Sequence, residues 1–242
     1  MILPKEKVPK SVKNPRLLLM YGKPKSGKTT IASKLKGNLI VDLEGGSQYL
    51  DALAVQARTL QELVAVINAL KTEKEKTGKN PYPYITLDSG TALESIAEDL
   101  GLILYQRTRM GKTYRGKILD LPNGAGYKYV RDAFLDLLEQ FMLYTDHLIL
   151  MCHSKDIMIE KEGKEMSEID VDLTGKLGRI VTSRADAVGL FYREKNRNIL
   201  NFKGDGTFIS EARIDHLRGQ VIEIGSSDEN NNITTNWNLI YK

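Results

Sequence analysis

Short apolar runs alternate with segments of helical periodicity over the first two thirds of the chain. Three runs read as buried strands, at residues 16–21, 84–88 and 147–152. Continuous apolar runs of this length are typical of parallel strands buried on both faces. A further strand is expected at 38–43, and helical segments are expected at 29–36, 59–71, 91–104 and 129–145. The pattern predicts an α/β fold with a mostly parallel central sheet and helices on both faces.

The pattern changes from residue 188 onward. The runs AVGLFYR, NILNFK and QVIEIG are separated by turns rich in Asn and Gly, which predicts antiparallel strands and a β-rich part over 188–242. We find no repeat and no linker, so residues 16–242 are expected to form one domain. Residues 1–15 are rich in Lys and Pro and predict an extended basic arm, and KTEKEKTGKNPYP is expected to be a charged surface loop.

Composition argues against a disulfide-bonded, membrane-spanning or secreted protein and adds little else. Hydrophobic residues make up 41% and charged residues 27% of the 242 positions, as in ordinary soluble proteins. The single cysteine, Cys152, excludes an intramolecular disulfide and lies in an apolar run, where a buried thiol is expected. No apolar run reaches the roughly 20 residues of a membrane span, and no signal peptide is recognised, so we expect a cytoplasmic protein. A net charge of +4 is compatible with a polyanionic partner.

Residues 22–29, GKPKSGKT, match the phosphate-binding pattern G-x-x-x-x-G-K-[ST] between a predicted strand and a predicted helix. Backbone amides of such a loop turn inward onto phosphates, and the following helix N-terminus adds positive potential. Lys28 is expected to reach the β- and γ-phosphates, and Thr29 to bind Mg²⁺. The sequence therefore predicts Mg²⁺ and ATP as cofactors. The expected nucleotide-binding residues are Gly22, Lys23, Pro24, Lys25, Ser26, Gly27, Lys28, Thr29 and Thr30.

Two carboxylates at predicted strand ends extend this site. Asp88 closes the run YITLD and is expected to hold Mg²⁺ together with Thr29; a helix N-cap is the alternative role. Glu44 follows the strand in VDLEGG, at the crevice where ligands of open α/β sheets bind. There it is expected to orient and deprotonate the attacking water, unless it only begins a loop. Asp42 is expected to be structural.

In the order GKPKSGKT, VDLEGG, TLDSGTAL, the chain resembles the RecA-like ATPases over residues 16–190. Within that group it is most similar to phage-encoded nucleotide-binding proteins, some described as single-strand-annealing recombination ATPases. The resemblance implies that Glu44 is the catalytic base. It also implies that His153, in a place where Gln or Asn is commoner in RecA, senses the γ-phosphate, with Lys155 as an alternative. Assembly into a ring or filament is implied as well.

The stretch 105–128 carries six basic residues against one acid, Asp120, interleaved with tyrosines and glycines. Basic groups follow a phosphate backbone and tyrosines stack on bases, so single-stranded DNA is the expected partner; a solvated loop is the alternative. The resemblance places the first DNA-binding loop here and a second one within 154–184. The expected DNA-binding residues are Arg107, Arg109, Lys112, Tyr114, Arg115, Lys117, Lys128, Lys176 and Arg179. Which basic residue reaches a neighbouring subunit's nucleotide stays open among Arg179, Arg184, Arg193 and Lys195.

The sequence thus predicts a RecA-like, Mg²⁺-dependent ATPase that binds single-stranded DNA. It is expected to act in phage recombination, annealing or replication in the host cytoplasm. A homo-oligomer is expected, and a single-stranded-DNA-binding protein is a candidate partner. Two alternatives remain: a small-molecule nucleotide kinase, and a non-catalytic assembly switch that binds ATP. The close spacing of VDLEGG and the lack of an Arg-rich lid disfavour the kinase, and Glu44 disfavours the switch.

Overall fold

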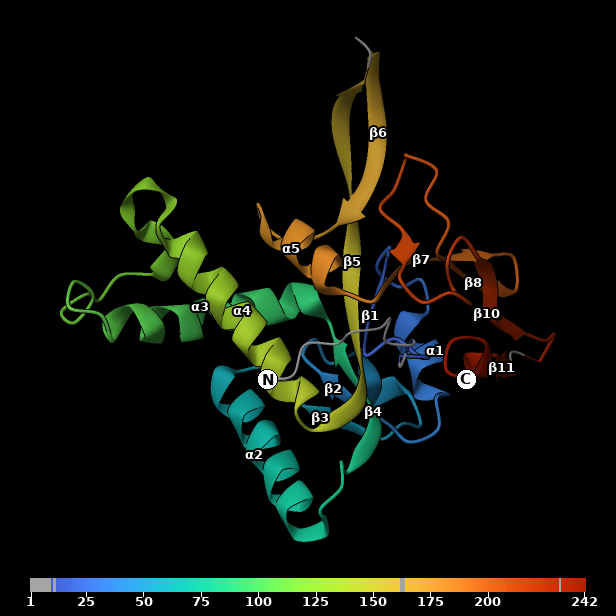
Figure 1. Cartoon of the computed structure of the whole chain (residues 1–242), viewed down its shortest axis with the longest axis horizontal. Helices are drawn as coiled ribbons and strands as arrows, with labels where there is room; N and C mark the ends of the chain where they lie inside the picture. The colour runs from blue at the N-terminus through green and yellow to red at the C-terminus, as the bar shows by residue number, and fades with distance from the viewer. Residues whose placement is uncertain (1–9, 11, 162–163, 231) are drawn as a thin grey trace, which may run out of the picture.

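The chain folds around one broad β-sheet (Figure 1). The computed structural model describes residue 10 and residues 12–161, 164–230 and 232–242, so most of the expected arm at 1–15 lies outside the described residues. Within the described part, eleven strands form the sheet in the order β11-β10-β8-β7-β1-β5-β4-β2-β3, with β6 paired to β5 and β9 to β7.

The centre of the sheet is parallel. Its parallel strands are β1 (Leu17–Gly22), β2 (Asn38–Asp42), β3 (Ala54–Gln56), β4 (Tyr82–Asp88), β5 (Thr145–Lys161) and β7 (Ala187–Glu194). Every residue of β1 is buried, as a strand covered on both faces requires. The predicted α/β class with a mostly parallel sheet is confirmed.

Two hydrophobic cores cover the two faces of the sheet. The first packs β1 residues such as Leu19 against four helices: α2 (Leu60–Thr77), α3 (Gly90–Gln106), α4 (Gly126–Met142) and α5 (Leu177–Arg184). The second packs residues of the opposite parity, such as Leu18, against α1 (Lys28–Ser33) and C-terminal residues that include Trp237. Alternate side chains of one strand thus enter different cores, because a strand points successive residues to opposite faces.

Helix α2 is longer than predicted, since it continues through Thr77 into the segment expected to be a charged loop. The prediction failed because the last turns are polar and lack apolar periodicity. They are helical because long charged side chains favour helix and pair along it, as Lys71 does with Glu75 at 3.9 Å. Gly78, with φ 69°, ends the helix in a left-handed cap.

Two predicted loops are also partly regular. The expected loop at 154–184 is wrong: β5 continues to Lys161, β6 (Lys164–Val171) returns antiparallel, and α5 follows. Period-2 alternation, as at Ile169 and Val171, is the strand signal here. In Figure 1 the β5–β6 hairpin projects from the body of the molecule. The stretch 105–128 contains the short 3₁₀ helices η2 (Ile118–Asp120) and η3 (Pro122–Gly124), and its end belongs to α4.

The β-rich C-terminal part extends the same sheet. Strands β8 (Arg197–Asn201), β10 (Val221–Ser227) and β11 (Ile233–Thr235) are antiparallel, as predicted, and β9 (Glu211–Ala212) pairs with β7. The strand β7 itself departs from the prediction, because it runs parallel to β1. The helix α5 precedes β7 and returns the chain to the opposite end of the sheet, which a parallel strand requires.

The C-terminal residues reach back to early parts of the chain. In the 3₁₀ helix η4 (Trp237–Leu239), the indole Nε1 of Trp237 donates to the Ile31 carbonyl at 3.0 Å. Asn14 and Lys242 exchange two hydrogen bonds, each 2.7 Å long. No helix in the described residues has both the length and the apolar character needed to cross a membrane.

Candidate nucleotide site

The predicted site residues meet at the carboxyl edge of the parallel strands. Register pairs Gly22, the last residue of β1, with His153 of β5, and pairs Asp42 of β2 with Asp88 of β4. The order β1-β5-β4-β2 therefore brings the ends of β1, β4 and β2 beside His153 of β5. Ligands of open α/β sheets bind at this edge.

The phosphate loop between β1 and α1 has a backbone that favours glycine at two positions, for different reasons. Gly27 has φ +102°, which side-chain-bearing residues rarely adopt. Gly22 is required by packing, because a Cβ there would lie 2.1 Å from the carbonyl oxygen of Phe191 on β7. Lys25 is also left-handed, with φ 59°, and Lys23, Pro24 and Lys25 are exposed on the loop.

Lys28 is folded back onto its own loop. Its Nζ donates to the carbonyls of Gly22 at 2.9 Å and Lys23 at 3.0 Å, and the side chain is buried. Burial lowers the pKa of this ammonium, while the nearby Asp88 opposes that change. The lysine is thus a desolvated cation held by neutral acceptors.

The residues of this loop fit a phosphate chain and a magnesium ion. The hydroxyl of Ser26 is buried and has no hydrogen-bond partner in the described part of the chain. An unsatisfied buried hydroxyl in a loop of amide donors suits an anionic ligand. The oxygen ligands Thr29 and Asp88 lie together, with Thr29 Oγ1 donating to Asp88 Oδ2 at 2.6 Å, and hard oxygen donors suit Mg²⁺.

Asp88 is a buried carboxylate, 6% exposed. Burial raises its pKa above the ordinary range, against the opposing hydrogen bond from Thr29. The N-cap of α3 is the next residue, Ser89, whose hydroxyl accepts from the Ala92 amide at 3.3 Å. Ser89, and not Asp88, therefore caps helix α3.

Glu44 lies two residues past β2 and is held from two sides. The hydroxyl of Ser89 donates to Oε1, and Nε2 of His153 lies 3.0 Å from Oε1 and 3.3 Å from Oε2. An ionised carboxylate only accepts, so this contact assigns the proton to Nε2 of His153. The Glu44 side chain is 37% exposed, so water reaches the carboxylate.

His153 is anchored beyond Glu44. Its backbone amide donates to Thr91 Oγ1 at 3.3 Å, and that hydroxyl donates to the carbonyl of Asp172 at 3.2 Å. Nδ1 of His153 is buried without a partner among the described residues. The resulting chain of hydrogen bonds links the carboxylate of Glu44 to the residues that follow β6.

Asp42 fixes the loop that carries Glu44. Its carboxylate accepts from the amides of Glu44, Gly45, Gly46 and Ser47 at 2.6–3.3 Å and from the Ser47 hydroxyl at 2.6 Å. Although burial alone would raise the pKa of Asp42, the hydrogen bonds from Ser47, Gly45 and Glu44 lower it overall. The side chain is fully buried, which agrees with the structural role expected from the sequence.

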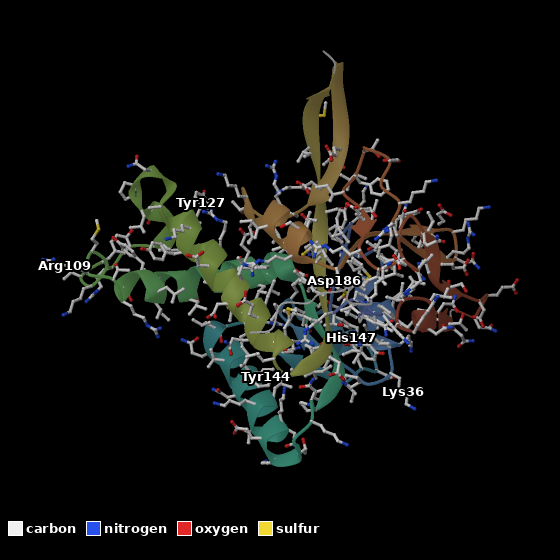
Figure 2. The ribbon with its side chains drawn as sticks, in the orientation of Figure 1. Lys36, Arg109, Tyr127, Tyr144, His147 and Asp186 are labelled. Carbon is white, nitrogen blue, oxygen red and sulfur yellow. The ribbon has the colours of Figure 1, made fainter. Side chains whose placement is uncertain are left out.

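The predicted DNA-binding residues of 105–128 lie on a projection formed by the ends of α3 and α4. Figure 2 shows Arg109 at its outer end. The exposed basic side chains form no ion pair within the described residues; they are Arg107, Arg109, Lys112, Arg115, Lys117 and Lys128. Tyr114 is packed against Tyr105 with ring centroids 5.4 Å apart, and its hydroxyl donates to Lys117 O at 2.8 Å. Tyr127 has an exposed ring instead.

The two stretches predicted to bind DNA meet in a shallow groove of about 370 Å³. Its lining residues are Gly124, Tyr127, Arg131, Thr174, Gly175 and Lys176. Arg131 was missed by the sequence reasoning, although it lies four residues after Tyr127 and hence on the same face of α4. Lys176 is the N-cap residue of α5, and Arg179 is exposed one turn further on.

The basic residues considered for action on a neighbouring subunit differ in their surroundings. Arg184 pairs with Glu139 at 2.7 Å. Arg193 donates to the Lys195 carbonyl at 2.9 Å and to Ser227 at 3.3 Å. Arg179 forms no ion pair within the described part of the chain.

Sequence reasoning also missed Ser89 and Thr91, which hold Glu44 and His153. Their signal was their position, directly after Asp88 at a strand end. Thr30 is half-buried in the first turn of α1. The loop at 22–29, the contact between Thr29 and Asp88, and the carboxylate of Glu44 thus lie at one sheet edge.

Comparison with known proteins found a family model and a similar solved structure. The family model AAA_24, described as an AAA domain, matches residues 14–214. No curated protein matches the chain. A solved structure described as the crystal structure of the RadB recombinase is similar over 91% of this chain and 90% of that chain, with 14% identity and a TM-score of 0.47. Because the family model spans most of the sequence, the chain belongs to the AAA domain family.

Proposed function

We propose that this protein is a Mg²⁺-dependent ATPase that binds single-stranded DNA and acts in phage recombination, annealing or replication. The observation that carries the ATPase proposal is the position of Glu44, fixed by Ser89 and His153 on the same sheet edge as Lys28, Thr29 and Asp88. Residues 16–242 act as one ATPase domain in this proposal, since the C-terminal strands extend the same sheet.

Each residue has a role set by its chemistry. Mg²⁺-ATP supplies the phosphoanhydride bond that is broken. Lys28 exchanges its two carbonyl acceptors for phosphate oxygens, which suit a desolvated cation better. Thr29 and Asp88 hold the metal. Glu44 orients a water molecule and accepts its proton, and the water-accessible carboxylate is suited to this.

His153 and Ser89 act as positioning residues in this proposal, because each holds a carboxylate oxygen of Glu44. His153 also links the site to Asp172 through Thr91. The groove at Thr174–Lys176 begins two residues later. A change at Glu44 during hydrolysis therefore has a short physical route to the proposed DNA-binding surface.

The DNA-binding proposal depends on the unpaired positive charge of the α3–α4 projection and on the adjoining groove. The groove combines an exposed aromatic ring, Tyr127, with two cations, Arg131 and Lys176. Stacking on a tyrosine does not depend on the base, and cations bind the backbone, so this combination suits single strands. A ring or filament is part of the proposal, with Arg179 and Lys195 as the candidates whose side chains form neither an ion pair nor a hydrogen bond within the described residues.

The test is steady-state phosphate release from ATP and Mg²⁺, with and without single-stranded DNA, at low and moderate salt. Stimulation by DNA that fades with salt, and turnover lost in Lys28→Ala and Glu44→Gln, are expected. Turnover that ignores DNA would remove the DNA assignment and leave the ATPase. Phosphorylated nucleotide in place of free phosphate would indicate a kinase, and turnover unchanged in Glu44→Gln would favour an assembly switch.

A further inference from the structure

Strand β8, from the β-rich C-terminal part, places a polar side chain against the phosphate loop. Oδ1 of Asn198 lies 3.7 Å from the position that a Cβ would take on Gly27. Apart from the neighbours of Gly27 in the chain, no other residue has a heavy atom within 4 Å of that position in the described structure. Asn198 is therefore the side chain that borders the open side of Gly27.

Asn198 is in an unusual state for a buried asparagine. As a residue it is 6% exposed, and its side chain makes no hydrogen bond within the described residues; its amide atoms are nevertheless not among the fully buried polar atoms without a partner, so they face solvent-accessible space. The buried Asn38, in contrast, has hydrogen-bond partners for both side-chain atoms. Its Nδ2 donates to Ala32 O and its Oδ1 accepts from Thr86, both at 2.9 Å. The Asn198 amide has no such partner in the described structure.

The position of Asn198 in the sheet places its amide where the apolar core ends. Asn198 and Leu200 lie on the same face of β8, and Leu200 enters the apolar core shared with α1. Register pairs Asn198 with Arg193, beyond the end of β1, where that core gives way to the phosphate loop. Ser26, next to Gly27, has a buried hydroxyl without a hydrogen-bond partner among the described residues. The Asn198 amide and the Ser26 hydroxyl thus both lie near Gly27 without a partner in the described structure.

We propose that Asn198 is a nucleotide-binding residue, whose amide donates a hydrogen bond to the phosphate chain cradled by Gly27 and Lys28. This inference rests on the proposed nucleotide binding. An amide offers two N–H donors, and rotation by 180° about its last bond presents Nδ2 in the space that Oδ1 faces. The C-terminal strands then contribute directly to the nucleotide site, in addition to extending the sheet.

The experiment measures binding of the fluorescent nucleotide mant-ADP with Mg²⁺, and thermal unfolding of the nucleotide-free protein. Asn198→Ala is expected to weaken affinity by about 10- to 100-fold, as loss of a hydrogen bond to a charged group does. Asn198→Asp is expected to weaken it further, because a carboxylate repels phosphate. Asn198→Ala should not lower the Tm of the nucleotide-free protein, since the amide has no partner there. Asn68→Asp, an equal charge change on an exposed position of α2, is the matched control and should bind like wild type.

The outcomes separate this inference from the function on which it rests. If wild type binds mant-ADP, Lys28→Ala weakens binding and both Asn198 variants bind like wild type, the Asn198 assignment is wrong and the nucleotide site stands. A lower Tm for nucleotide-free Asn198→Ala, with unchanged affinity, would assign a structural role and overturn the proposal. If wild type does not bind mant-ADP, both proposals fail.

Discussion

Glu44 is the residue at which the proposed chemistry can be separated from binding. Glu44→Gln keeps the shape and removes the base, so phosphate release should fall by about 100-fold or more. Affinity for mant-ADP should stay within about twofold, because Lys28 and Thr29 are untouched. Steady-state phosphate release and fluorescence titration measure the two quantities, and equal losses in both would contradict this role.

His153 is expected to act through Glu44. Its Nε2–H contacts the carboxylate, and the amide nitrogen of a glutamine also donates. His153→Gln should therefore retain more of kcat than His153→Ala, with KM for ATP little changed in either variant. If alanine and glutamine lower kcat equally, the hydrogen bond to Glu44 is not what His153 contributes.

We expect the carboxylate of Asp88 to lower folding stability at neutral pH while being required for activity. Burial raises the pKa of Asp88 in the folded protein above its value in the unfolded chain. The protonated side chain therefore stabilises the folded state at low pH, and this stabilisation is lost as pH rises through the folded pKa. At pH 7 the nucleotide-free Asp88→Asn variant should have a Tm at least equal to that of wild type, while Mg²⁺-dependent turnover is lost. The difference in Tm should shrink toward pH 4; a lower Tm of the variant at pH 7 would refute this reasoning.

At the residue scale, short spacing pointed to Lys28 and Thr29 through the loop pattern, and to Asp88 and Glu44 through their positions after strands. The structure brings these four residues to one sheet edge, and their roles stay predictions. The contacts of Ser89, Thr91 and Asn198 were not anticipated, because they join distant segments of the chain. Such contacts follow from sheet order, which no local pattern specifies.

At the scale of elements, the carboxylate of Asp42 fixes the loop after β2 through hydrogen bonds. The hydrogen bonds to Asp42 lower its pKa, so its stabilisation is present above the unfolded pKa and is lost as pH falls through the folded pKa. Asp42→Asn should cost about 1–3 kcal/mol in urea unfolding at pH 7 and less at pH 3. Asp120→Asn, an exposed carboxylate on η2, is the control and should change little; a pH-independent loss would contradict the assignment.

Element boundaries were predicted best where apolar periodicity was strong. Strands β1 and β4 and helix α3 were found within about two residues. The β5–β6 hairpin was missed because its charged residues suggested a loop, although alternation of apolar and polar positions was present at Ile169 and Val171. Helix α2 was cut short for the same reason, since charge was interpreted as irregular structure.

At the scale of the whole molecule, the α3–α4 projection carries six exposed basic side chains, with Arg109 at its outer end (Figure 2). Replacing Arg107, Arg109 and Lys112 by alanine should weaken single-stranded DNA binding and reduce the slope of log affinity against log salt by about 2, near 0.7 for each lost contact. Affinity for mant-ADP should be unchanged. Fluorescence anisotropy with labelled DNA measures the slope.

A triple alanine variant of Lys71, Lys76 and Lys79 removes the same charge around the C-terminal end of α2, outside the α3–α4 projection. It should leave the salt slope unchanged. Equal effects of the two variants would indicate that only net charge matters. The meeting of Tyr127 and Lys176 in one groove was beyond sequence reasoning, because it depends on how α4 packs beside the turn before α5.

The paired hydrogen bonds between Asn14 and Lys242 give the backbone the form of an almost closed ring. A few linking residues between these positions would complete that ring without moving a strand. An exposed turn such as 203–207 would then serve as new termini, because chains tolerate cuts at exposed turns. A circular permutant opened at this turn offers a way to attach a partner or probe there.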